Sequence, residues 1–113
     1  MILLLTRDVF FASKVTGTAQ QLGLAAATVM SLDALREKLT VGRVSGVILD
    51  LGSGIAPAEV QGIVTVSPRP KLIAFGAHVD TVALQAAQAA GFDDVMPRSK
   101  FAGTLPELLQ RIS

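Results

Sequence analysis

The run Val47-Ile48-Leu49-Asp50 joins three apolar residues to a single carboxylate. A continuous apolar run is typical of a parallel strand buried on both faces, and open α/β folds place their chemistry at the carboxyl ends of such strands. The pattern therefore predicts that Asp50 lies at the carboxyl edge of a buried sheet. An acid in that position is the first candidate functional residue of the chain.

Other reactive side chains are scarce. The sequence has no cysteine, which excludes disulfides, thiolate metal sites and thiol catalysis. His78 is the only histidine, so a histidine metal set is also missing. We expect His78 in a loop near the edge that carries Asp50, but no nucleophile or oxyanion donor accompanies the two residues. Asp93 and Asp94 are adjacent, and we expect them to cap and solvate the start of a strand. The sequence therefore predicts no catalytic residue, metal or cofactor.

Composition predicts one domain over residues 1–113. Half of the residues are apolar and 17% are charged, compared with the roughly 25% usual in soluble domains. This is enough for a core on both faces of a sheet, and it leaves apolar surface for a partner or for self-association. A net charge of +1 and the absence of Trp and Tyr argue against nucleic-acid binding. The apolar start, Met1–Leu5, is too short for a signal or a membrane span, so we expect a cytoplasmic protein.

Strand-like and helix-like segments alternate along the chain. Apolar runs predict strands over residues 2–5, 25–30, 44–51, 72–75 and 95–96. Helical spacing predicts helices over residues 9–22, 32–41, 57–66, 81–90 and 102–112, with Asp8, Ser31 and Asp80 as N-caps. Five β-α units in series predict a flavodoxin-like, three-layer α/β fold with a parallel five-stranded sheet of order 2-1-3-4-5.

Three segments carry a resemblance to a known family. Ala89–Met96, with the sequence AAGFDDVM, resembles the segment KAGADDYL of receiver domains in bacterial response regulators, and Leu22-Gly23 and Val47–Asp50 also fit. The match covers the whole chain, which therefore resembles a CheY-like receiver. The resemblance implies that the aspartate ending strand three accepts a phosphoryl group from a histidine kinase. It also implies Mg²⁺ on two acids after strand one, a Ser or Thr after strand four and a Lys after strand five.

The sequence departs from this pattern at every position except Asp50. The acid pair falls on Thr6 and Arg7, with Asp8 in the next position. The hydroxyl position falls on Gly76, or on Phe75 if the register slips by one residue, and the lysine position falls on Arg98. Mg²⁺ requires oxygen ligands, which Arg7 does not offer. We expect the Arg7 guanidinium to pair with Asp50 in place of the metal, with an attraction of roughly 4 kcal/mol before desolvation.

The departures predict a degenerate receiver, or pseudo-receiver, that acts in signal transduction as a protein-interaction module. Its expected partner is a histidine kinase or an output domain, or a second copy of the chain bound through helix 81–90, strand 95–96 and helix 102–112. The alternative is a receiver that uses Mg²⁺ and is phosphorylated on Asp50. The sequence is equally compatible with a stand-alone protein and with one domain of a larger regulator.

One further motif overlaps the same acid. Val47–Gly54 resembles motif I of S-adenosylmethionine-dependent methyltransferases, VLDLGSGxG. The last glycine of the motif is Ala56 in this chain, and the motif follows the third predicted strand instead of the first. The acid expected about 20 residues further on is missing. A methyltransferase fragment that binds S-adenosylmethionine is therefore the third alternative.

Overall fold

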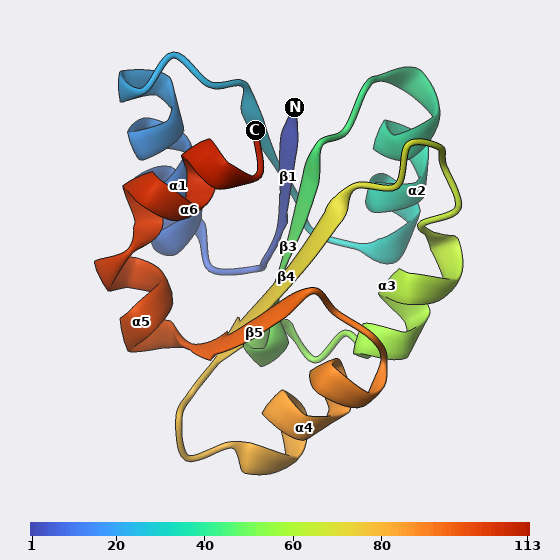
Figure 1. Ribbon diagram of the computed structural model, residues 1–113, viewed down its shortest axis with the longest axis vertical. Coiled ribbons are helices and arrows are strands. Elements are labelled where there is room, and N and C mark those ends of the chain that lie inside the picture. Colours follow the sequence, from blue (N-terminus) through green and yellow to red (C-terminus); the bar gives the residue numbers. More distant parts are fainter.

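The computed structural model of the protein describes all residues from 1 to 113. Five parallel strands form one sheet in the order β2-β1-β3-β4-β5 (Figure 1). The strands are β1 (Ile2–Leu5), β2 (Ala26–Val29), β3 (Gly46–Asp50), β4 (Lys71–Gly76) and β5 (Asp94–Pro97). The predicted fold class and strand order are confirmed.

Helices cover both faces of the sheet. They are α1 (Val9–Gln21), α2 (Leu32–Val41), α3 (Pro57–Ile63), α4 (Thr81–Ala89), α5 (Arg98–Gly103) and α6 (Leu105–Arg111). Figure 1 shows α1, α5 and α6 on one face and α2, α3 and α4 on the other. None of the helices is long and apolar enough to cross a membrane.

The alternation of side chains along the strands divides the core in two. Leu5 of β1 and Leu49 of β3 belong to a buried cluster with residues of α2, α3 and α4. Leu4 and Ile48, which are paired in register, belong to a second cluster with residues of α1, α5 and α6. Because successive residues of a strand face opposite sides, Asp50 shares the α1 face with Ile48.

Three helices begin at the N-caps that the sequence predicts. The side chains of Asp8, Ser31 and Asp80 accept hydrogen bonds from backbone N–H groups in the first turns of α1, α2 and α4. Each cap satisfies a donor that has no partner inside its helix. The cap at Asp8 also fixes the carboxylate at the start of α1, close to the end of β1.

The predicted final helix over residues 102–112 is wrong. The structure has two helices, α5 and α6, separated at Thr104. Pro106 has no N–H to donate to a carbonyl one turn earlier, so the helix restarts with Pro106 in the first turn of α6. The first of the two helices begins at Arg98, four residues earlier than predicted, directly after the extended Pro97. Similarly, α3 ends at Ile63 and does not continue to residue 66.

Candidate functional site at the carboxyl edge of the sheet

Asp50 ends β3 and is 3% exposed. The hydroxyl of Thr6 donates a hydrogen bond to Asp50 Oδ2 at 2.7 Å, and the backbone N–H of Gly52 donates to Oδ1 at 2.9 Å. The Ser53 hydroxyl donates to the Asp50 carbonyl at 2.7 Å. Both oxygens of the carboxylate therefore have a partner, one from the end of β1 and one from the turn after β3.

Arg98, the first residue of α5, lies beside two carboxylates. Its Nη2 is 3.5 Å from Asp50 Oδ1, and its Nη1 is 3.7 Å from Asp8 Oδ2. Both distances exceed the roughly 2.7–3.2 Å of a hydrogen bond, so the attraction is mainly between charges. The Arg98 side chain is 41% exposed. Because solvent screens such a pair, we expect it to contribute about 0–1 kcal/mol to folding.

Three phenylalanines pack against one another beside the guanidinium, and we call them the phenylalanine cluster: Phe11, Phe75 and Phe101. The Arg98 Cζ atom is 4.7 Å from the centroid of the Phe11 ring and 5.3 Å from that of Phe75. Phe75 and Phe101 are stacked, with centroids 4.4 Å apart and an interplanar angle of 14°. The ring faces attract the cation, by about 0.5–1 kcal/mol at a partly exposed position. The cluster therefore helps to hold Arg98 in place.

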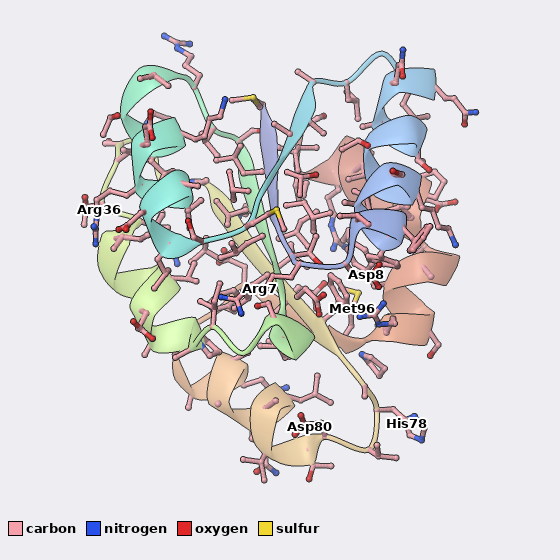
Figure 2. All side chains as sticks on the ribbon, turned by 180° about the vertical axis from the view of Figure 1, so that it is seen from behind. Arg7, Asp8, Arg36, His78, Asp80 and Met96 are labelled. Atoms are coloured by element: carbon pink, nitrogen blue, oxygen red, sulfur yellow. The ribbon has the colours of Figure 1, made fainter.

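The predicted ion pair between Arg7 and Asp50 is wrong, because Asp50 pairs with Arg98. Thr6 and Asp50 lie on the same side of the sheet, where the Thr6 hydroxyl reaches the carboxylate. Arg7 is the next residue, and alternation turns it to the other side. Figure 2 shows Arg7 on the side of α3 and Asp8 on the side of α1. Arg7 is exposed.

Solved structures, and not sequence matches, identify the fold of this chain. No family model matches the sequence, and no curated protein matches it. The signal receiver domain of a response regulator from Bermanella marisrubri superposes with a TM-score of 0.83 at 18% identity, over 98% of this chain and 95% of that chain. The receiver domain of NtrX from Brucella abortus gives 0.83 at 18% identity, over 99% and 97%. The chain has the fold of a response-regulator receiver domain.

A third structure of this fold contains a metal. The receiver domain of the sensor histidine kinase PA1611 from Pseudomonas aeruginosa PAO1 has a magnesium ion coordinated in its active site cleft. It superposes with a TM-score of 0.79 at 16% identity, over 98% of this chain and 94% of that chain.

The two acids at the carboxyl edge have partners other than a metal. The ion requires near-octahedral oxygen coordination and usually one or two carboxylates. Here Asp50 accepts hydrogen bonds on both oxygens, and Asp8 Oδ1 accepts the N–H groups that cap α1. The guanidinium of Arg98 faces both acids and would repel a second cation.

Gly76, the position at which the receiver resemblance implies a hydroxyl, is the last residue of β4. A Cβ atom added there would lie 3.2 Å from both Cβ and Cδ1 of Leu51. Leu51 is 9% exposed and follows Asp50 in the 3₁₀ turn Leu51–Ser53. The close packing of Leu51 against Gly76 therefore leaves little room for a serine or threonine at this end of β4.

The remaining candidate residues lie apart from Asp50. His78 is exposed in the loop after β4, and Figure 2 shows it pointing away from the protein. Asp93 Oδ2 accepts the N–H of Leu72 at 2.8 Å, which joins the segment before β5 to β4. Asp94 forms an ion pair with Arg111 at 3.0 Å. These acids tie the sheet and α6 together and do not extend the site.

Sequence reasoning placed Arg98 at the edge of the site but missed the phenylalanine cluster. Arg98 and Phe101 are three residues apart, a spacing that places two side chains on one face of a helix. This spacing is informative only if the helix begins at Arg98, whereas the sequence predicted a start at residue 102. The role of Leu51 beside Gly76 has no sequence signal, because it depends on the distance between two strand ends.

Proposed function

We propose that this chain is a degenerate receiver, a signal-transduction module that binds a protein partner and is not phosphorylated on Asp50 by the Mg²⁺-dependent route. The observation that carries the proposal is the set of partners at Asp50: the Thr6 hydroxyl, at a position where the receiver pattern has an acid, donates to Asp50 at 2.7 Å, and the Arg98 guanidinium lies 3.5 Å from Asp50 and 3.7 Å from Asp8. A cation supplied by the chain itself stands beside the two acids that a metal ion would need.

Three further features support the proposal. Thr6 stands at one of the two positions where the receiver pattern has an acid, and its hydroxyl donates a hydrogen bond to Asp50. Arg7 occupies the other acid position and is exposed. Gly76 offers no hydroxyl and packs against Leu51. In this proposal the domain has no catalytic turnover and no resident cofactor, and it works in the cytoplasm.

The proposed contact face is formed by α4, β5 and the two helices that follow β5. Thr81–Ala89, the whole of α4, carries no charged side chain. Val79, just before the N-cap Asp80, and Val82, in the first turn of α4, are 74% and 76% exposed. Exposed apolar residues next to an uncharged helix favour a protein contact. The proposed occupants are a histidine kinase, an output domain or a second copy of the chain.

A phosphodonor experiment tests the proposal. The protein is incubated with acetyl phosphate and Mg²⁺, or with beryllofluoride and Mg²⁺, and its intact mass and amide NMR spectrum are recorded. We expect no added phosphoryl mass and no shift of resonances around Asp50. An Asp50→Asn variant, treated in the same way, is the control for modification elsewhere. Added mass that is lost in Asp50→Asn would overturn the proposal in favour of a phosphorylated receiver.

The phosphorylated receiver is the second candidate, and one observation favours it. Arg98 occupies the lysine position of receivers and is in ionic contact with Asp50, as a cation that pairs with a phosphoryl group there would be. The methyltransferase alternative has less support, because the glycine-rich segment after Asp50 is used in its own turn. The N–H of Gly52 binds Asp50, and Gly54 has a φ of 82°. A rise in melting temperature with S-adenosylmethionine would support that alternative.

A pair of matched variants tests the contact face. Val82→Glu places a charge on α4, and Val41→Glu places one on the last residue of α2, where Val41 is 74% exposed. If the chain dimerises through the α4 face, light scattering will show a dimer for the native protein and Val41→Glu and a monomer for Val82→Glu. If the native protein is a dimer and both variants are dimers too, the contact lies elsewhere on the surface.

A further inference from the structure

The two edges of the sheet differ in how they are protected against pairing with another strand. β5, at one edge, carries Asp94, which pairs with Arg111 at 3.0 Å, and ends at Pro97, which has no N–H to donate. Charged residues and proline on an edge strand hinder the addition of a further strand. β2, at the other edge, has the sequence AATV and contains neither. The chain therefore protects one edge of its sheet and leaves the other open.

The open edge of β2 presents backbone groups without a partner strand. β2 pairs with β1 alone, and the carbonyls of Ala25 and Val29 accept N–H groups of β1 and of the residue after it. Alternate residues of a strand bond to the same neighbour, so the N–H and C=O groups of Ala26 and Thr28 point to the open side. Figure 2 looks onto this edge, where β2 lies between α1 and α2. The edge therefore has donors and acceptors for one more strand.

The surroundings of this edge carry no charge. No charged residue stands between Lys14 and Asp33, a segment that contains the second half of α1, the whole of β2 and the N-cap of α2. Two copies of the chain can therefore bring this segment together without repulsion between like charges, whereas a strongly charged partner would find no opposite charge here. Met30, directly after β2, is 52% exposed and adds apolar surface at the same edge.

The edge of β2 is complementary to itself. When two β2 strands pair antiparallel with Ala27 facing Ala27 of the second copy, Ala26 of each copy faces Thr28 of the other. Each such pair exchanges two hydrogen bonds. The twofold axis passes through the pair of Ala27 residues, so one surface serves both copies. At that pair the Cα atoms approach to about 4.5 Å, and the small side chain of alanine leaves the strands free to meet.

The helix beside β2 leaves room for the second copy. Because the twofold axis is perpendicular to the joined sheet, α1 of one copy lies on the same face as α1 of the other. An open groove of about 640 Å³ runs along α1 and β2, and Ser13, Gly17 and Gln20 line it on the helix. A Cβ atom added to Gly17 would meet nothing within 4 Å. The groove therefore allows a helix contact to support a strand contact that is only four residues long.

We propose that the free edge of β2 pairs with β2 of a second copy, which joins two sheets into one continuous sheet and brings α1 of each copy together. This dimer goes beyond the proposed function and does not depend on whether Asp50 is phosphorylated. β2 and β5 are opposite edges of the sheet. The α4 face therefore stays open in both copies for a histidine kinase or an output domain.

Matched glycine variants test the dimer by light scattering over a range of concentrations. Gly17→Lys places a charge in the groove, where the twofold axis brings two lysines together, and should raise the dissociation constant of the dimer by about tenfold or more. Gly62→Lys makes the same change on α3, where an added Cβ atom also meets nothing within 4 Å, and should leave the dimer intact. Val82→Glu, on the α4 face, should leave it intact as well. Circular dichroism checks that each variant is folded.

Two measurements on the native protein locate the strand pairing without any substitution. Amide exchange at Thr28 should slow as the protein concentration rises, by about tenfold when about nine-tenths of the chains are dimeric, because exchange then proceeds through the remaining monomer. In a mixture of isotope-labelled and unlabelled copies, a filtered NOE should connect the Hα atoms of Ala27 in the two copies. These atoms are close together only in the antiparallel register described above.

The β2 dimer is overturned by a native protein that stays monomeric up to about 1 mM, or by a Gly17→Lys variant that dimerises as well as Gly62→Lys. It is also overturned by a dimer that Val82→Glu dissociates, or by a dimer without the NOE between Ala27 residues. None of these measurements uses a phosphodonor. The β2 dimer can therefore fail while the phosphodonor result stands, and added mass on Asp50 would leave the dimer measurements unchanged.

Discussion

The hydroxyl of Thr6 donates a 2.7 Å hydrogen bond to Oδ2 of Asp50, and both residues are buried, at 1% and 3% exposure. The resemblance to receivers implies an acid at the position of Thr6, which would place a second negative charge next to Asp50. Threonine instead supplies a donor. The site is therefore satisfied within the protein, and the stability of the fold should depend on this contact.

Removing the hydroxyl should be costly. Thr6→Val keeps the shape of the side chain but leaves one oxygen of a buried carboxylate without a donor, which should lower the free energy of unfolding by about 1–3 kcal/mol. Thr6→Ser keeps the hydroxyl and should cost less than Thr6→Val. Urea unfolding monitored by circular dichroism measures both. Equal losses for the two variants would show that the methyl group, and not the hydrogen bond, matters.

The two arginines at the edge should behave differently. Arg98→Ala loses an ionic contact and the contacts with Phe11 and Phe75, and should lower the free energy of unfolding by about 1–2 kcal/mol. Arg7→Ala should change it by less than about 0.5 kcal/mol, as is usual for an exposed residue. Urea unfolding at low and high salt checks this, because salt should reduce only the ionic part of the Arg98 effect. A larger effect at Arg7 would restore the ion pair predicted from the sequence.

Restoring a hydroxyl after β4 should strain the fold. Gly76→Ser brings a Cβ atom within 3.2 Å of Leu51, and overpacking of this kind costs about 1–3 kcal/mol. The penalty should be smaller in a Leu51→Ala background, since the contact to Leu51 Cδ1 disappears. Ala77→Ser, at the exposed next position, is the control and should be nearly neutral. Thermal unfolding is measured for Gly76→Ser, Leu51→Ala, the double variant of both changes, and Ala77→Ser. The comparison shows whether Leu51 is the residue that excludes a side chain at position 76.

Two other glycines should respond to alanine with opposite signs. Gly17 lies inside α1, and a Cβ atom added there would meet nothing within 4 Å, so Gly17→Ala should stabilise the protein by about 0.5–1 kcal/mol. A Cβ on Gly46 would lie 2.9 Å from Ile112 Cδ1, so Gly46→Ala should destabilise it by about 1–3 kcal/mol. Differential scanning calorimetry of the two variants measures the sign of each change in stability. A destabilised Gly17→Ala would point to an unrecognised contact of α1.

The strands and the starts of α1, α2 and α4 were predictable because they depend on local signals. Apolar runs marked the strands, and the side chains of Asp8, Ser31 and Asp80 cap helices as expected. The break at Thr104 was missed although Pro106 was visible, because proline also fits the first turn of a helix. The same residue is compatible with a start and with an interruption, and only packing decides between them.

The partner of Asp50 was harder to predict, because it depends on the side to which one residue points. Thr6 and Arg7 are neighbours, and a carboxylate attracts a guanidinium more obviously than it attracts a hydroxyl. The pairing of Leu4 with Ile48 puts Thr6 on the face of Asp50. Arg98 reaches the same acid from a segment 48 residues away, counted from 50 to 98 in the sequence. Its place beside the phenylalanine cluster depends on a helix start that the sequence did not reveal.

The four residues of β1, Ile2–Leu5, are all apolar and all buried. Both faces of this strand could therefore tolerate a shift by one residue, since each face would still receive isoleucine or leucine. With the start of the strand fixed, however, deletion of one of these residues would bring Thr6 into the place of Leu5 and Arg7 into the place of Thr6. In evolutionary terms the length of β1 is constrained more tightly than its composition, because a change of one residue in that length would change the partner of Asp50 and put a hydroxyl into the core on the side of α2, α3 and α4.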